Sequence, residues 1–118
     1  MIVSDHPILF DGLRVVCART SDAEIVAESL DVTQAMRNFT RCKPDVAIVD
    51  LQLPLARLVI RLLRGLCSRM PILVLTTGSR ELVYHGARNP LIQVSKSAPT
   101  EVIVDTARTA VLAKKNTP

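Results

Sequence analysis

Short, continuously apolar runs alternate along the chain with longer segments in which apolar residues recur every three or four positions. The runs at residues 46–49 and 72–75 are apolar throughout, which is typical of strands buried on both faces of a parallel sheet. Three more segments complete a set of five predicted strands: residues 1–4, 23–27 and 91–94. Because helical segments separate these runs, the pattern predicts an α/β domain whose parallel sheet is covered by helices on both sides.

The helical segments have recognisable starts and stops. Residues 7–18 carry one apolar stripe, and Pro7 stands at the first position, where a missing N–H is tolerated. A second helix follows Asp31, which together with Gln34 resembles a capping box, and it ends before Lys43-Pro44. The other predicted helices cover residues 55–66, residues 79–86 and a segment that starts around residue 99.

Composition limits the classes of protein to which the chain can belong. A length of 118 residues fits one domain, and 48% hydrophobic with only 3% aromatic residues indicates an aliphatic core. No apolar run approaches the roughly 18 residues of a membrane span, and the start lacks the features of a signal peptide, so we expect a cytoplasmic protein without membrane contact. Three widely spaced cysteines suggest neither a disulfide framework nor a zinc site. A net charge of +4, not gathered in one run, does not favour direct contact with nucleic acid.

Polar side chains follow four of the five predicted strands: Asp5, Asp50, Thr76 and Lys96. In a doubly wound sheet of order 2-1-3-4-5, strands one and three flank the point where ligands bind, and strand two, which has no such group, lies at the outside. Two carboxylates about 5 Å apart repel by roughly 3 kcal/mol at an effective dielectric of about 20, so we expect a neutralising cation, most plausibly Mg²⁺. Lys96 would pair with Asp50 when the site is empty and with a phosphoryl group when one is bound, and Thr76 would donate to the same group. This set suits phosphoryl transfer to a carboxylate.

Several motifs with a joint spacing carry a family resemblance. They are Val3-Ser4-Asp5-His6-Pro7 with Phe10 and Gly12-Leu13, residues 44–51 with Pro54, Leu75-Thr76, and Val94-Ser95-Lys96 with Pro99. Together they resemble the receiver domain of bacterial two-component response regulators. The Asp-His-Pro opening is similar to the NarL/FixJ group, whose members carry a LuxR-type helix-turn-helix output domain.

The resemblance implies a fold and a set of roles. It implies a five-stranded, flavodoxin- or CheY-like fold that signals rather than acts as an enzyme. Asp50 would accept phosphate from a histidine kinase, while Asp5, Asp50 and the backbone carbonyl of Gln52 would ligate Mg²⁺. Thr76 and Lys96 would sense the phosphoryl group.

The resemblance also bears on domain limits and partners. Residues 1–113 would form the receiver domain, and residues 114–118 would begin a polar linker. Homodimerisation would be expected, with the first and last helices as candidates for its surface. DNA would be contacted only through a C-terminal output domain that is not in this chain, and the output would be transcriptional.

Departures from the family pattern leave alternatives open. Ser4 stands where the family has the first of two adjacent acids, so metal affinity should suffer; Ser4 is either a weak substitute that hydrogen-bonds a metal-bound water or a sign of a decayed site. Gln93 takes the place of an aromatic switch residue. A phosphorylation-independent receiver that acts as a dimerisation or interaction module is therefore an alternative to a phosphoacceptor. An unrelated small α/β enzyme or nucleotide binder is a third, although no glycine-rich phosphate loop follows any strand. His6 is interpreted as a residue that starts a helix, and His85 as a surface residue.

Overall fold

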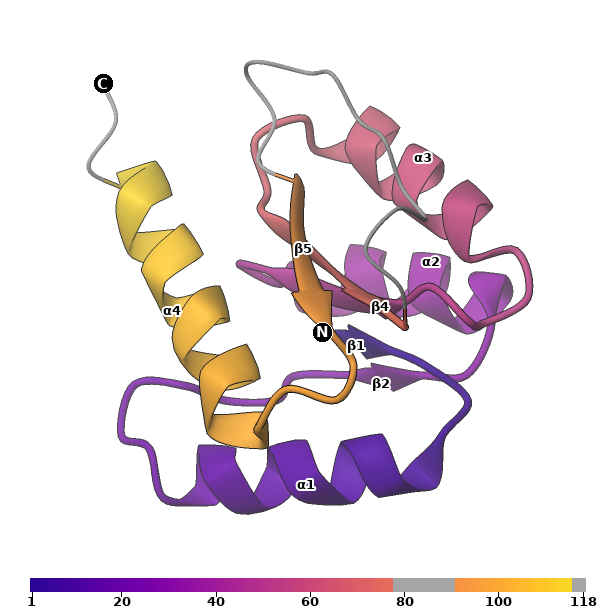
Figure 1. Cartoon of the computed structure of the whole chain (residues 1–118). Helices are drawn as coiled ribbons and strands as arrows, with labels where there is room; N and C mark the ends of the chain where they lie inside the picture. The colour runs from indigo at the N-terminus through magenta and orange to yellow at the C-terminus, as the bar shows by residue number, and fades with distance from the viewer. Residues whose placement is uncertain (78–90, 116–118) are drawn as a thin grey trace.

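The computed structural model describes residues 1–77 and 91–115, and these contain a five-stranded parallel sheet in the order β2-β1-β3-β4-β5. Helices α1 and α4 cover one face, and α2 and α3 cover the other (Figure 1). The strands are β1 (Ile2–Val3), β2 (Glu28–Ser29), β3 (Ala47–Asp50), β4 (Ile72–Thr76) and β5 (Leu91–Ser95), and the helices are α1 (Pro7–Ala18), α2 (Val32–Cys42), α3 (Ala56–Leu66) and α4 (Thr100–Lys115). The doubly wound fold and the strand order predicted from the sequence are confirmed.

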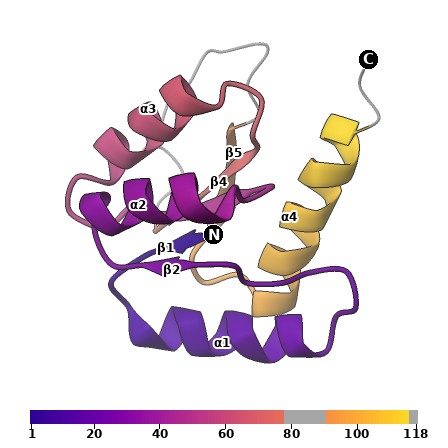
Figure 2. The same cartoon turned by 180° about the vertical axis from the view of Figure 1, so that it is seen from behind.

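The sheet separates two hydrophobic cores. Alternate residues of the central strands face opposite sides, so Val49 and Val74 join the core under α2 and α3, whereas Ile48 and Leu73 join the core under α1 and α4. Every residue of β3 and β4 is buried, as the continuous apolar runs predicted. Figure 2 shows the same three layers from behind.

Helices α1 and α2 begin where their sequence signals place them. Pro7 occupies the first turn of α1, and the Asp31 carboxylate accepts a hydrogen bond from the Gln34 backbone N–H at 2.8 Å, which satisfies one of the unpaired donors of α2. Lys43 ends α2 in the left-handed conformation, with φ of 46°, and the following Pro44 prevents the helix from continuing. These predicted boundaries are confirmed.

The prediction of a second strand at residues 23–27 is wrong. The strand observed is Glu28–Ser29, and residues 23–27 approach it as an irregular segment. Strand β1 is only two residues long, and it pairs Ile2 with Glu28 and Val3 with Ser29. The paired residues of β2 therefore follow the apolar residues 25–27 in the sequence. Ile25 is still partly buried, because it packs from the loop against the core under α1 and α4.

The last helix extends beyond its predicted end. Helix α4 continues to Lys115, so Lys114 and Lys115, which were assigned to the polar tail, are helical. The helix predicted at residues 79–86, like residues 116–118 of the tail, lies outside the described residues.

Among the helices that are described, none combines the length and the apolar character that crossing a membrane requires. The three cysteines are free thiols, in agreement with the sequence.

Gly12 allows α1 to approach the start of α4 closely. A Cβ atom at this position would lie 3.1 Å from the Thr100 hydroxyl oxygen, which is tighter than an ordinary van der Waals contact. On either side of this point, Phe10, Leu13 and Ile103 are buried together. The close approach fixes the position of α4 and therefore of the segment that connects it to β5.

We expect the substitution Leu55→Asn to stabilise the fold. Leu55 precedes α3 with φ of 63°, its side chain is exposed, and a left-handed conformation costs a leucine about 1 kcal/mol, whereas asparagine tolerates it. The free energy of unfolding measured in urea should rise by about 0.5 to 1 kcal/mol. Leu66→Asn, at an exposed position within the same helix, is the matched control and should give no gain.

Candidate functional site

Polar residues from four of the strands meet at the carboxyl edge of the sheet. Ser4 and Asp5 directly follow β1, Asp50 is the last residue of β3, Thr76 is the last residue of β4, and Lys96 directly follows β5. Parallel strands share one carboxyl edge, and this common direction brings together residues that are far apart in the sequence. The predicted convergence of Asp5, Asp50 and Lys96 at one edge is observed.

The Asp50 carboxylate lies at the centre of the cluster and is completely buried. Its Oδ2 atom accepts hydrogen bonds from the Ser4 hydroxyl and from Lys96 Nζ, each at 2.7 Å. Its Oδ1 atom accepts a hydrogen bond from the backbone N–H of Gln52 at 3.0 Å. The buried charge is therefore held by one cation and two neutral donors.

The balance of burial and hydrogen bonding sets the pKa of Asp50. Burial alone would raise it, because desolvation disfavours the charged form. The hydrogen bonds from Lys96, from Ser4 and from the Gln52 amide favour the ionised form and outweigh burial, so the pKa of Asp50 lies below its ordinary value. Asp50 is a carboxylate at neutral pH and can act as an acceptor or as a nucleophile.

Lys96 contacts both the buried Asp50 and the exposed His6. Besides Asp50, its ammonium donates to the Gln52 side-chain oxygen at 2.9 Å and contacts Nδ1 of His6. Its backbone N–H donates to the carbonyl of Thr76 at 2.8 Å, so the lysine is anchored to the end of β4 while its side chain reaches β3. The predicted pairing of Lys96 with Asp50 is observed.

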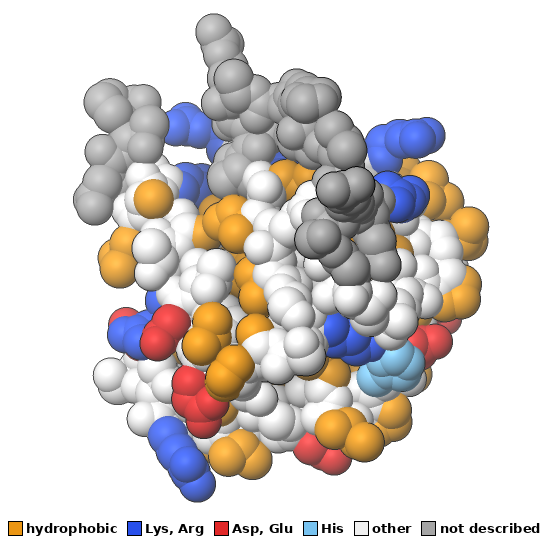
Figure 3. Space-filling view, in the orientation of Figure 1, with side chains coloured by type: hydrophobic (Ala, Val, Ile, Leu, Met, Phe, Trp, Pro, Cys, Tyr) orange, Lys and Arg blue, Asp and Glu red, His pale blue; other side chains and the backbone are white. Residues whose placement is uncertain are grey.

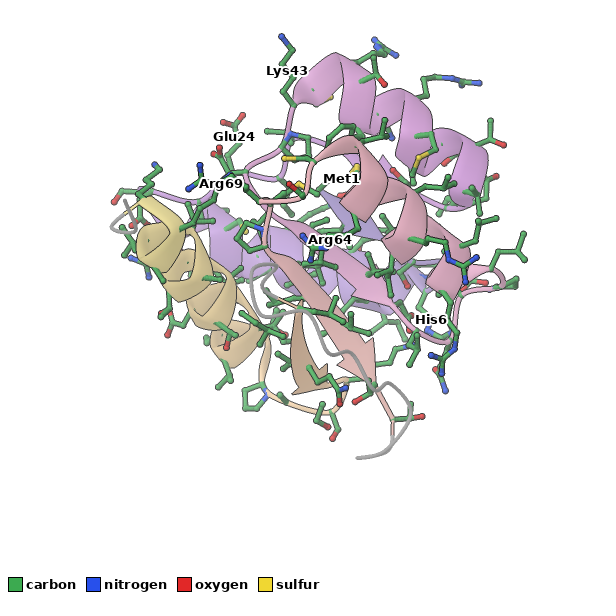
Figure 4. The ribbon with its side chains drawn as sticks, turned by 90° about the horizontal axis from the view of Figure 1, so that it is seen from above. Met1, His6, Glu24, Lys43, Arg64 and Arg69 are labelled. Carbon is green, nitrogen blue, oxygen red and sulfur yellow. The ribbon has the colours of Figure 1, made fainter. Side chains whose placement is uncertain are left out.

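Asp5 and His6 form the exposed side of the cluster. The side chains of Asp5 and His6 are 47% and 46% exposed, and Asp5 Oδ1 lies 3.7 Å from His6 Nε2. Figure 3 shows this surface, where a histidine touches a basic and an acidic side chain. In Figure 4, His6 lies beyond the arrowheads of the strands, whereas Glu24 and Lys43 lie towards the other end of the sheet.

Thr76, Gln52 and Ser4 also lie at this edge of the sheet. Thr76 lies at the same edge with its side chain nearly buried, and its backbone carbonyl is the group that contacts Lys96. Gln52 was predicted to contribute its backbone carbonyl; its backbone N–H and its side-chain oxygen contact Asp50 and Lys96. Ser4 was interpreted as a weak substitute for an acid, and its hydroxyl donates directly to Asp50.

The donor set is compatible with a bound divalent cation. One ligand atom from each of Asp5, His6 and Asp50 can be chosen so that all lie within 4.8 Å of one another. Carboxylate oxygens suit a hard ion such as Mg²⁺. Ser4, however, brings no charge, and Lys96 occupies the same Asp50 oxygen that a cation would use, so a metal ion and the ammonium compete for it.

His6 is the residue of the cluster that the sequence interpretation missed. It does start a helix, since it is the N-cap of α1, but its imidazole also lies 3.3 Å from Asp50 Oδ2. The available signal was its position between the end of β1 and Pro7, because a residue between a strand end and a helix start must lie at the carboxyl edge. His85, which was interpreted as a surface residue, lies outside the described residues.

Sequence comparison finds two regulatory proteins. Over 114 residues, 92% of this chain, the chain is 28% identical to the oxygen regulatory protein NreC of Staphylococcus aureus, and the match covers 52% of that protein. It is 36% identical over 70 residues, 59% of this chain and 32% of the relative, to the DNA-binding transcriptional activator DevR/DosR of Mycobacterium tuberculosis. The chain thus spans about half, or less, of the length of these relatives. No family model matches the sequence.

Comparison of folds gives the same result. A two-component response regulator of the LuxR family from Aurantimonas sp. SI85-9A1 superposes with a TM-score of 0.76 and is 25% identical. The match covers 96% of this chain and 84% of that one. The likeness therefore extends over nearly the whole sheet and its helices.

We expect Lys96→Met to raise the pKa of Asp50 above its ordinary value, since burial then opposes ionisation with only neutral donors left. In the parent, the lowered pKa of Asp50 stabilises the fold at pH values above the aspartate pKa of the unfolded state, about 3.9. This stabilisation is lost as pH falls through the pKa of Asp50 in the folded state. In the variant the sign reverses, so stability should increase as pH falls from the raised pKa towards about 4. NMR titration of the Asp50 carboxyl carbon and urea unfolding between about pH 3 and 7 measure both effects. A titration midpoint unchanged from the parent would contradict the role assigned to Lys96.

Proposed function

Because the chain is a receiver domain of the NarL/FixJ type of response regulator, we propose that Asp50 accepts a phosphoryl group and that the modified domain controls an output domain. The observation that carries this proposal is the buried, ionised Asp50, which is held at the carboxyl edge of the sheet by Lys96 and Ser4. A carboxylate that is ionised at neutral pH, with a cation beside it, is suited to attack phosphorus and then to share its cation with the product.

The residues of the cluster have separate tasks in this reaction. One Asp50 oxygen attacks the phosphorus of a phosphohistidine, the O–P bond forms, the P–N bond breaks, and the donor imidazole leaves and takes up a proton. Oδ2 is the oxygen that faces Lys96, and Oδ1 stays fixed by the Gln52 N–H. After transfer, the Lys96 ammonium binds a phosphoryl oxygen, and the Thr76 hydroxyl donates to the same group.

Mg²⁺ would be held by Asp5, Asp50 and the backbone carbonyl of Gln52. When bound, it neutralises the negative charge that gathers on the phosphoryl oxygens. Ser4 replaces a potential third acid by a neutral hydroxyl, so binding of the ion is weak and depends on displacement of the Lys96 ammonium from Asp50.

The wider role is proposed from relatives of whose length this chain spans about half or less. We infer that the phosphoryl donor is a histidine kinase and that a C-terminal output domain contacts DNA in the cytoplasm. Residues 1–113 act as the receiver, and residues 114–118 begin the linker, whose first two residues continue α4. A homodimer would use α1 and α4, whose outer faces carry the exposed Ile8, Val15, Val102 and Leu112. An atypical receiver that works without phosphorylation is the alternative outcome of the experiments below.

Incubation with acetyl phosphate and Mg²⁺ should add one phosphoryl group to the parent and none to Asp50→Asn. Intact-mass measurement detects the adduct directly. Asp45→Asn, at an exposed position shortly before β3, is the matched control and should be modified like the parent. If the parent gains no adduct, the atypical, phosphorylation-independent receiver is supported. If the Asp50 variant is modified as much as the parent, a residue other than Asp50 is the acceptor and the proposal fails.

The substitution Ser4→Asp should strengthen Mg²⁺ binding by about tenfold, since it adds a carboxylate beside Asp50. The same change should lower the stability of the metal-free domain, because two buried carboxylates would share one ammonium. Isothermal titration calorimetry and urea unfolding measure the two effects. Ser4→Ala, which removes the hydroxyl without adding charge, should not strengthen binding; an equal gain in both variants would refute the account of Ser4.

A further inference from the structure

Lys96 shows what surrounds a cation at this edge of the sheet. Its ammonium contacts an Asp50 oxygen, the Gln52 side-chain oxygen and Nδ1 of His6. An ammonium has only donors, so Nδ1 must be the acceptor, with its lone pair directed at the cation. We propose that His6 Nδ1 is a direct ligand for a divalent transition-metal ion at this position, together with Asp50, and that this nitrogen makes the site prefer such ions to Mg²⁺. The proposal rests on the proposed function only in that both assign cation binding to this cluster.

The separation of the two ligand atoms fits a single ion. His6 Nδ1 and Asp50 Oδ2 are 3.3 Å apart. Two atoms that are each about 2.1 Å from one ion lie about 3.0 Å apart at a right angle and about 3.4 Å apart at a tetrahedral angle. The observed separation lies within this range, so both atoms reach one ion without movement of either side chain.

The orientation of the ring supports the same assignment. His6 turns Nδ1 towards Asp50 and Lys96 and its other nitrogen, Nε2, towards the Asp5 carboxylate at 3.7 Å. A metal-binding histidine commonly has a carboxylate on its second nitrogen, which fixes the ring orientation and raises the basicity of the ligand. Asp5 is in the right place for this task when Nδ1 holds the ion.

The donor types decide which ions are favoured. Mg²⁺ prefers oxygen ligands, whereas an imidazole nitrogen suits first-row transition ions, whose affinities rise from Mn²⁺ towards Cu²⁺. Ser4 brings a neutral hydroxyl and no carboxylate to the cluster, while Nδ1 of His6 lies 3.3 Å from Asp50 Oδ2. Selectivity at this site is therefore set mainly by His6.

The test compares Co²⁺ with Mg²⁺ by calorimetry on the parent and on His6→Gln. Affinity for Co²⁺ should fall by about tenfold to 100-fold, and affinity for Mg²⁺ by less than about threefold. The chain has two histidines, so His85→Gln is the matched control for adventitious binding and should leave Co²⁺ affinity unchanged. In proton NMR, Co²⁺ should broaden the ring signals that His6→Gln removes, and no cobalt–thiolate absorption band should appear, which excludes the free cysteines.

Two further results decide between the roles of the acidic residues. Asp5→Asn should weaken Mg²⁺ more than Co²⁺, the reverse of His6→Gln. An equal loss of both ions in His6→Gln, or no loss of Co²⁺, would overturn the proposal. Phosphorylation is measured separately, by intact mass. A domain that takes up no phosphoryl group but keeps the His6-dependent preference for Co²⁺ would refute the proposed function alone. A domain that is phosphorylated but shows no such preference would refute this inference alone.

Discussion

A buried carboxylate imposes the main constraint on this structure. Asp50 has no exposed surface, and an isolated charge in that environment would be strongly disfavoured. Lys96 supplies the opposite charge from a position 46 residues away, and Ser4 and the Gln52 N–H supply the remaining hydrogen bonds. The ends of β1, β3 and β5 must therefore keep their relative positions, because displacement of any one would leave the carboxylate incompletely paired.

The helices hold these strand ends in place. Helix α1 begins immediately after the cluster, and His6 is both its N-cap and a neighbour of Asp50. Gly12 lets α1 and α4 approach closely, and α4 in turn follows the short turn that carries Lys96. Packing on the face under α1 and α4 is thus coupled to the position of the ammonium. Two strands of only two residues each are sufficient on the β1–β2 side, because the cores on both faces supply most of the stabilisation.

The sequence predicted the parts of the structure that depend on long patterns or on strand ends. Continuous apolar runs located β3 and β4, and the rule that parallel strands share an edge placed Asp5, Asp50 and Lys96 together. It failed for β2, because a two-residue strand has no periodicity of its own and the apolar residues before it pack as a loop. It also missed His6, since the direction of one side chain in a tight strand-to-helix connection depends on backbone angles that no pattern encodes. The sequence showed a serine directly before Asp5, but it did not show that the Ser4 hydroxyl donates to Asp50.

The competition for Asp50 Oδ2 links the chemistry of the site to the rest of the domain. The Lys96 ammonium holds that oxygen in the structure, and its backbone N–H is bonded to the carbonyl of Thr76 at the end of β4. A metal ion or a phosphoryl group that draws the ammonium away would therefore act on the turn between β5 and α4, which is bonded to the end of β4. Binding free energies are reciprocal, so whatever holds this segment in a new position must also favour the modified or metal-bound form of Asp50 by the same amount. A single lysine makes this link, with its backbone at the edge of the sheet and its charge beside Asp50.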